Sequence, residues 1–269
     1  MANVPADSVH HVDGATGTQS IERAASLLRA VSGDAAGVTT ARAASLTGLT
    51  RPTAHRILSA LQRAGLLDLD NVRGVWLLGP ELFLLGSLAA PRFDVAELAR
   101  DEIRALAEAT GESAFLSVRR GDENVCVLRE EGSFPLRSFV LQEGTRFPLG
   151  VASGGLAILS FLEDAEIDAY FRRVTLERRW GPTHAEEQVR GRIAATRAAG
   201  YATNPALVLE GSWGMGAAVF DERGAPSGAV SITGVESRFR DERRPELGRL
   251  LLRAAHEVTR RIQGVVPRR

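Results

Sequence analysis

The side chains best suited to recognising another molecule gather in residues 49–65. One face of this segment is polar and basic and carries Arg51, Thr53, His55 and Arg56. The opposite face is apolar, which is the pattern of a helix with one buried side. Arginine can bond to both acceptors on the edge of guanine, and threonine can meet a thymine methyl group or a phosphate. These side chains near the start of one helix predict a recognition helix for the major groove of DNA.

Further residues are placed to contact the DNA backbone around that helix. Thr39, Thr40 and Arg42 stand at the start of a short preceding helix, and Thr50 is the N-cap of the recognition helix. Arg73 lies at the tip of a predicted hairpin, where it can reach a phosphate or the flanking minor groove. An ordinary solvated helix face is the alternative for any one of these residues. Their order along the chain favours a DNA-binding surface.

Three helices and a hairpin must position these side chains. Apolar spacing predicts helices over residues 19–30, 41–47 and about 51–64. Two short apolar runs, 66–69 and 75–78, flank turn-forming residues and predict a hairpin. Two helices joined by a short glycine-containing turn and followed by a hairpin are typical of a winged helix-turn-helix.

Charge is distributed unevenly along the chain. The 269 residues carry 33 basic and 33 acidic side chains, so net charge neither favours nor excludes nucleic acid. In residues 18–80 the charged residues are Arg23, Arg29, Arg42, Arg51, Arg56, Arg63 and Arg73 against Glu22, Asp34, Asp68 and Asp70. This local excess of positive charge suits a surface that meets phosphates.

The rest of the chain predicts a linker and a second domain. Residues 81–90 form an apolar helix that is too short to cross a membrane, and it exposes Leu82, Phe83, Leu85 and Leu88 as a dimer contact. We therefore expect a disordered tail (1–17), the winged helix-turn-helix (18–80), a linker helix (81–92) and a sensor domain (93–269).

Strand and helix patterns alternate unevenly in the sensor part. Helices are predicted over residues 94–110, 156–162, 164–174, 185–199 and 244–262. Strands are predicted over residues 113–119, 124–129, 136–141, 201–206, 215–220 and 228–233. Strands that pair through short turns, with helices bunched between them, indicate an antiparallel α+β domain.

Composition excludes several other classes of protein. No run approaches a membrane span, and the polar start of the chain lacks the apolar core of a signal peptide, so we expect a cytoplasmic protein. The single cysteine, Cys126, cannot form an internal disulfide or a cysteine-rich zinc site. Its apolar neighbours predict a buried strand residue. No metal site and no cofactor are expected.

Taken together, these motifs resemble the IclR family of bacterial regulators. The resemblance rests on Gln19–Ala24, Leu49–Gly65, Val75–Leu82, Gly144–Leu149 with Ser153–Gly155, and Gly200–Ala202 with Ala217–Asp221. It covers residues 18–262 in order. It implies a GAF-like antiparallel sensor domain with flanking helices, a dimer or dimer of dimers, and a palindromic operator. Repression is the more common habit of the family.

The resemblance also implies where a small-molecule effector binds. The matching positions are Leu136, Phe139, Val151, Ser153, Gly154, Asn204, Ser212 and Gly214. Family members that sense small keto acids tend to carry an acid and a cysteine where this chain has Asn204 and Gly214. A histidine and a basic residue are often found where this chain has Gly150 and Leu156. These departures favour a larger, partly apolar carboxylate or an aromatic metabolite.

Two other functions are weighed against a regulator. Ser153 suggests a nucleophile, but the glycine that a nucleophile elbow needs two residues earlier is missing. The glycine-rich segment 210–216 matches neither a phosphate loop nor a dinucleotide fingerprint. The winged helix alone is also compatible with a protein-binding adaptor. Sequence-specific DNA binding distinguishes the regulator from both alternatives.

Overall fold

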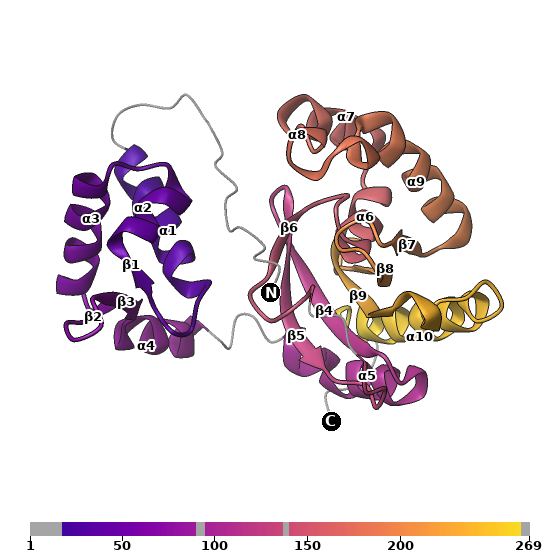
Figure 1. Ribbon diagram of the computed structural model, residues 1–269. Coiled ribbons are helices and arrows are strands. Elements are labelled where there is room, and N and C mark those ends of the chain that lie inside the picture. Colours follow the sequence, from indigo (N-terminus) through magenta and orange to yellow (C-terminus); the bar gives the residue numbers. More distant parts are fainter. Residues whose placement is uncertain (1–17, 90–94, 137–139, 265–269) are drawn as a thin grey trace. The chain divides into compact units, whose positions relative to one another are not determined.

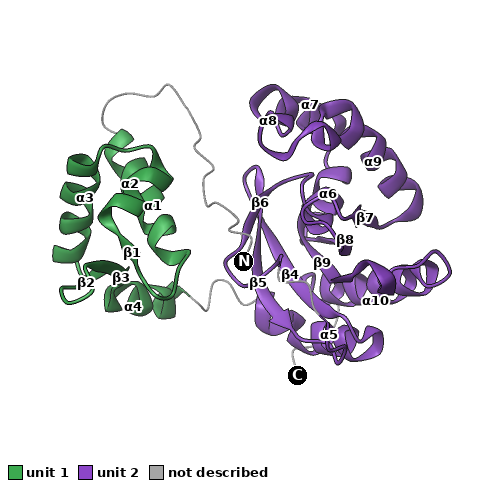
Figure 2. Ribbon diagram, in the orientation of Figure 1, with its two compact units in different colours: residues 1–93 green, residues 94–269 purple. Residues whose placement is uncertain are grey.

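The chain forms two compact units. A computed structural model describes residues 18–89, 95–136 and 140–264. The units comprise residues 1–93 and residues 94–269 (Figure 2). The expected tail, residues 1–17, and the predicted pocket residue Phe139 lie outside the described residues.

The first unit is a winged helix-turn-helix, as predicted. Its helices are α1 (Gln19–Ser32), α2 (Thr40–Thr47), α3 (Arg51–Arg63) and α4 (Pro80–Ala89). Its strands β1 (Val38–Thr39), β2 (Leu67–Asp70) and β3 (Val75–Leu78) pair antiparallel in the order β1-β3-β2. The core beneath α3 contains Leu27, Leu58 and Trp76, each at most 1% exposed. The two-residue strand β1 was not expected from the sequence, because so short a run has no periodicity to detect.

The second unit is built on one antiparallel sheet of order β6-β5-β4-β9-β8-β7 (Figure 1). Its strands are β4 (Ser113–Arg120), β5 (Glu123–Glu130), β6 (Arg146–Pro148), β7 (Ala202–Pro205), β8 (Ser212–Phe220) and β9 (Pro226–Val235). The helices α5 (Val95–Thr110) and α10 (Arg244–Ile262) cover one face. The opposite face carries α6 (Ser153–Ser160), α7 (Asp164–Arg173), α8 (Glu177–Trp180), the 3₁₀ turn η2 (Pro182–His184) and α9 (Glu186–Ala199). The α+β prediction is thus confirmed.

The predicted strand over residues 136–141 is wrong for the residues that can be described. Leu136, Val140 and Leu141 belong to no strand, and the chain instead pairs later, at β6. The outer edge of β5 is already occupied, because Cys126 exchanges backbone hydrogen bonds with Thr145 and Gly144 at 3.0 and 2.8 Å. The part of the β5 edge at Cys126 is therefore not available to an additional strand.

Within the described ranges, no helix is long and apolar enough to cross a membrane. Across the same residues, no three His, Cys, Asp or Glu side chains are grouped closely enough to hold a metal ion. Cys126 is 1% exposed in β5, which confirms it as a buried strand residue. Burial raises the pKa of its thiol to about 12, so the thiolate that a nucleophile needs is strongly disfavoured.

Candidate DNA-binding face and ligand pocket

The recognition helix α3 begins at an internal cap that leaves its polar face to solvent. The Thr50 side chain accepts a hydrogen bond from the backbone N–H of Thr53 at 3.4 Å, and the two hydroxyls lie 2.9 Å apart. Ala54, Leu58 and Leu61 are buried on the inner face. The outer face exposes the following side chains near the helix start: Arg51, His55 and Arg56. This arrangement suits a helix that inserts its first turns into a groove.

Two threonines at the start of α2 have separate structural roles. Thr39 is the N-cap, and its hydroxyl accepts from the Arg42 N–H at 3.3 Å. The hydroxyl of Thr40 accepts from the indole Nε1 of Trp76 at 2.9 Å, which ties β3 to α2. Thr40 therefore already has an internal partner, whereas the side chain of Arg42 is exposed. The prediction that both contact DNA stays open.

The hairpin places Arg73 on its turn, held by local contacts. The Asp70 carboxylate accepts the backbone N–H groups of Val72 and Arg73, both at 3.0 Å. The Arg73 guanidinium donates to the carbonyl of Ala36, and its side chain remains 53% exposed. The residue is available at the tip of the wing, but it must leave Ala36 to reach a phosphate.

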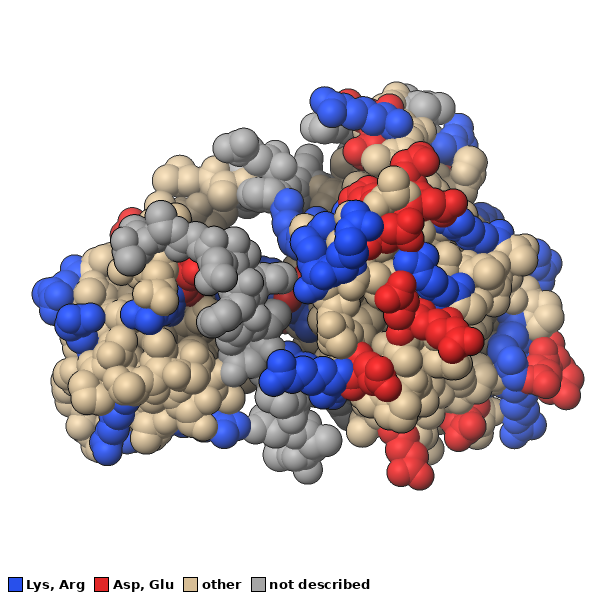
Figure 3. Space-filling model, turned by 90° about the horizontal axis from the view of Figure 1, so that it is seen from above, with Lys and Arg blue, Asp and Glu red and all other residues tan. Residues whose placement is uncertain are grey.

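In the visible face of the first unit, basic side chains predominate over acidic ones (Figure 3). Within the described residues, Arg42, Arg51 and Arg56 take part in no ion pair. Unpaired surface arginines on one face form the electrostatic footprint that a phosphate backbone requires.

In the second unit, the start of α6 packs directly on glycines of the sheet. A methyl group added at Gly214 of β8 would lie 3.0 Å from the Ser153 hydroxyl, and one at Gly216 would lie 2.7 Å from the Ser153 carbonyl oxygen. At Gly216 only glycine permits this approach, because the added methyl would meet backbone atoms, whereas at Gly214 it would meet the end of a side chain. Gly154 is less tightly enclosed, with 3.6 Å between an added methyl and the nearest atom, which belongs to Ala229. The α6 N-terminus has no side-chain cap.

Asn204 connects this helix start to β7. Its amide Nδ2 donates to the Val151 carbonyl at 2.7 Å, and its Oδ1 accepts from the Leu207 N–H at 3.2 Å. The structure thus brings together five of the predicted pocket residues: Val151, Ser153, Gly154, Asn204 and Gly214. Ser212 is the first residue of β8 and lies two residues before Gly214. Leu136 is 63% exposed, and residues 137–139 after it lie outside the described residues.

Three hydroxyl groups in the same region escaped the sequence analysis. The register places Gly214 opposite Thr233, Thr233 opposite Ser113, and Gly216 opposite Ser231, all on the α6 side of the sheet. The hydroxyls of Ser113, Ser231 and Thr233 are buried without a hydrogen-bond partner. Buried polar atoms without partners are rare and point to a missing water or ligand. Two hydroxyl residues at alternate positions in the apolar second half of β9, Ser231 and Thr233, were the available signal.

A buried histidine borders the same helix start. His184 is fully buried, and its Nδ1 lies 3.1 Å from the Trp180 carbonyl, while its Nε2 lies 3.5 Å from the Val151 carbonyl. Burial lowers the pKa of His184, and the nearby charge of Arg192 lowers it further. The neutral ring has one N–H, and the shorter contact favours placing it on Nδ1.

Two family models match this chain. The IclR helix-turn-helix domain matches residues 20–71, and the bacterial transcriptional regulator IclR C-terminal domain matches residues 88–260. The first match contains α1 to α3 and their exposed arginines. The second contains the whole six-stranded sheet with α6 on its face.

Individual relatives agree with these matches over most of the chain. The HTH-type transcriptional regulator KipR of Bacillus subtilis (strain 168) is 30% identical over 219 residues, covering 81% of this chain and 87% of that protein. The transcriptional repressor IclR of Escherichia coli (strain K12) is 27% identical over 252 residues, covering 91% and 90%. A solved IclR homologue from Microbacterium hydrocarbonoxydans, complexed with 4-hydroxybenzoate, has a TM-score of 0.71 at 20% identity, covering 91% and 99%. That last likeness shows the fold.

Proposed function

Because this chain belongs to the IclR family of bacterial transcriptional regulators, we propose that it is a ligand-responsive repressor that binds a palindromic operator as a dimer. The curated relatives are regulators, which sets the enzyme alternative aside. The observation that carries the proposal is the exposed, unpaired face of α3 with Arg51, His55 and Arg56. A repressor of this kind acts on DNA in the cytoplasm, on a catabolic operon.

Direct base contacts are assigned to the first turns of α3. Arg51 and Arg56 are long enough to bond guanine edges, and Thr53 and His55 lie between them on the exposed side. Backbone contacts are assigned to the start of α2, at Thr39, Thr40 and Arg42, to Thr50 at the α3 cap, and to Arg73 on the wing. Phosphate contacts orient the unit, and base contacts give it specificity.

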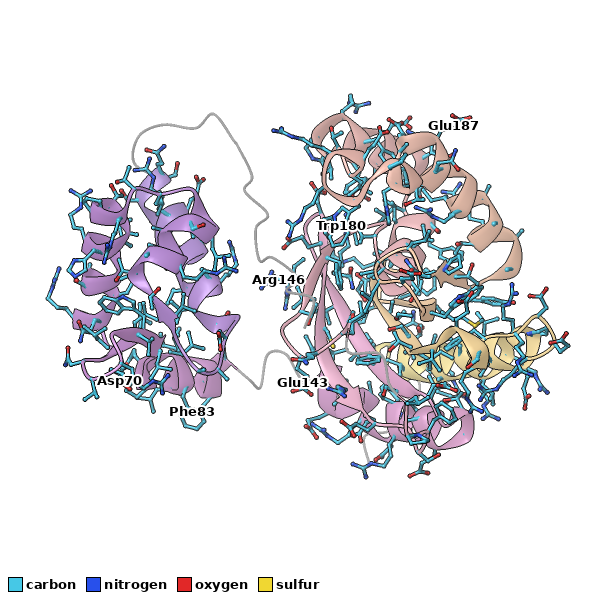
Figure 4. All side chains as sticks on the ribbon, viewed as in Figure 1. Asp70, Phe83, Glu143, Arg146, Trp180 and Glu187 are labelled. Carbon is cyan, nitrogen blue, oxygen red and sulfur yellow. The ribbon has the colours of Figure 1, made fainter. Side chains whose placement is uncertain are left out.

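A dimer is assigned to the apolar helix α4. None of its residues is buried, and Phe83 and Leu88 are 76% and 80% exposed. Figure 4 shows Phe83 at the outer surface of the unit. Leu84 and Leu85 add to this apolar surface, while Leu82 is half-buried. A contiguous exposed apolar surface indicates a protein contact, and a symmetric dimer matches a palindrome. The proposed division remains residues 18–80 for DNA, 81–92 for the linker and 93–269 for the effector.

The effector is assigned to the start of α6. The uncapped helix N-terminus favours a carboxylate. The unpartnered hydroxyls of Ser113, Ser231 and Thr233 are available as further donors, together with that of Ser153. Val151 supplies an apolar wall, and Leu136 and Phe139 belong to the same proposed pocket. The effector is therefore a carboxylate with an apolar or aromatic body. The complex of the Microbacterium homologue with 4-hydroxybenzoate supports this class.

A mobility-shift assay tests the central part of the proposal. The full chain is titrated against DNA from upstream of its own gene and of the neighbouring genes, at one stated salt concentration. We expect a shift that survives non-specific competitor and that a carboxylate effector changes. Equal binding to upstream and unrelated DNA would contradict a specific regulator.

Separate experiments test the dimer and the pocket. Phe83→Glu is expected to convert a dimer to a monomer in light scattering, whereas Val72→Glu, at a more exposed site outside α4, leaves the dimer unchanged.

Thr233→Val is expected to weaken calorimetric binding of 4-hydroxybenzoate, whereas Ser227→Ala on the same strand is not. A wild-type monomer, or binding of pyruvate but of no aromatic acid, would contradict these two assignments.

A further inference from the structure

Arg192 of α9 has a partly buried guanidinium that makes only one hydrogen bond among the described residues. Its Nη1 donates to the Thr183 carbonyl at 2.7 Å. Its Nε and Nη2 are buried and have no hydrogen-bond partner. Burial alone lowers the pKa of this guanidinium, and no carboxylate raises it. A partly buried cation without a counter-charge is costly, and its two buried N–H groups lack the acceptor that such groups normally have.

The two unpartnered atoms form one edge of the guanidinium. Nε–H and Nη2–H point the same way and match the two oxygens of a carboxylate. The same chain shows this pairing nearby: the Nε and Nη2 of Arg173 donate to Asp122 Oδ2 and Oδ1 at 3.2 and 2.8 Å. Arg190, two residues from Arg192 on α9, uses the same two atoms for Glu186 and Asp168 at 2.8 and 2.7 Å. In Arg192 the corresponding edge has no protein acceptor.

A third buried donor lies close in sequence to the carbonyl that accepts from Arg192. The indole Nε1 of Trp180 is buried without a partner. Trp180, the last residue of α8, packs against Phe147 of β6, with ring centroids 5.6 Å apart (Figure 4 labels Trp180). Only residues 181 and 182 separate it from Thr183, whose carbonyl holds Arg192. Indole and guanidinium groups donate but cannot accept, so a ligand of either group must be an acceptor.

We propose that the Nε–Nη2 edge of Arg192, with the indole N–H of Trp180, binds the carboxylate group of a small molecule. This site is separate from the α6 N-terminus and adjoins it, because His184 lies between Thr183 and the Val151 carbonyl. It does not rest on the proposed function, since a carboxylate can bind here whether or not the chain binds DNA. Occupation of the site supplies the counter-charge that the protein does not.

Thermal unfolding of the full chain tests this site. Acetate, benzoate and inorganic phosphate are titrated separately at constant ionic strength. Ligands that bind the folded state raise the melting temperature. We expect benzoate or acetate to stabilise the wild type, and Arg192→Gln to weaken the apparent affinity by about tenfold or more, the loss of a charge-assisted hydrogen-bond pair. Arg190→Gln, the same change at an exposed position of α9, is expected to retain the response. A response to phosphate alone, or an equal response in Arg192→Gln, would overturn the carboxylate site.

A second readout remains if Arg192→Gln alters folding. Trp180→Phe removes only the indole N–H from the set of donors and is expected to weaken the same carboxylate response. In NMR titrations of the full chain, bound carboxylate should raise the pKa of His184, because it offsets the charge of Arg192 that lowers it. An unchanged His184 titration at saturating acetate and benzoate would contradict a carboxylate bound at Arg192.

Discussion

The two units of this protein use arginine in opposite ways. In the second unit most described arginines meet an acid of the same unit, for example Arg173 with Asp122 at 2.8 Å and Arg238 with Glu112 at 2.7 Å. In the first unit, Arg42, Arg51 and Arg56 are exposed and meet none among the described residues. Paired arginines stabilise a fold, and unpaired ones remain available to a partner. In Figure 3, basic (blue) and acidic (red) side chains alternate over the visible face of the second unit, whereas blue predominates on the first.

The largest effect on stability is expected at a buried carboxylate that pairs with two arginines. Glu112 is 1% exposed and accepts from both Arg238 and Arg243 at 2.7 Å. Glu112→Gln should lower the free energy of unfolding by about 3 kcal/mol, because two cations lose their counter-charge. Asp168→Asn, which breaks an exposed pair with Arg190, should cost less than about 1 kcal/mol. Urea unfolding measures both, and equal losses would remove the distinction between buried and exposed pairs.

The unpaired arginines of α3 should affect binding and not folding. Arg51→Ala and Arg56→Ala should each weaken operator binding by about 1–3 kcal/mol if each side chain contacts a guanine. Fluorescence anisotropy of labelled DNA measures the loss, and urea unfolding should show no matching change. Arg63→Ala, at the far end of α3, is the control. An equal loss at Arg63 would mean that the helix acts only through general charge.

A smaller and non-specific effect is expected at Arg42. If this side chain neutralises one phosphate, Arg42→Ala should reduce the slope of log affinity against log salt by about 1. The preference for the operator over unrelated DNA should remain. A changed preference with an unchanged slope would instead assign Arg42 to base contacts.

The smallest effect concerns the second unit at low pH. The pKa of His184 is lowered in the folded protein, so the unfolded chain binds the proton more readily. The stability that His184 contributes is therefore complete above its ordinary pKa of 6.5 and declines as the pH falls below that value. His184→Gln should flatten the melting temperature between about pH 7 and pH 5. His256→Gln, on the exposed side of α10, should leave this pH dependence unchanged. A steeper fall of the melting temperature with falling pH in His184→Gln would contradict a stabilising neutral His184.

Local signals predicted most of the architecture. Thr50 and Pro52 marked the start of α3, and the apolar period of α10 gave its bounds, Arg244–Ile262. The predicted strand over residues 136–141 was wrong at Leu136, Val140 and Leu141, because a pattern of apolar residues does not reveal that the β5 edge at Cys126 is already occupied. That information is held in long-range pairing and not in the segment itself.

The grouping of residues at the start of α6, where we propose the pocket, was predictable only in part. Motif order placed Val151, Ser153, Asn204 and Gly214 together, but Ser113, Ser231 and Thr233 join them through cross-strand register. Their lack of partners is a property of the packed sheet and cannot be read from residue types. The lack of an acceptor at Arg192 Nε and Nη2 is likewise visible only once the side chains around it have been placed.

The affinity ratio between upstream DNA and a scrambled fragment of equal composition tests the central claim most directly. It is measured by anisotropy at one salt concentration, for the wild type and for Arg51→Ala. We expect the wild type to bind upstream DNA much more tightly than the scrambled fragment, and Arg51→Ala to reduce this affinity ratio by roughly tenfold or more. Equal wild-type affinity for the two fragments, or a preference that Arg51→Ala leaves intact, would contradict base recognition by Arg51 on the exposed face of α3.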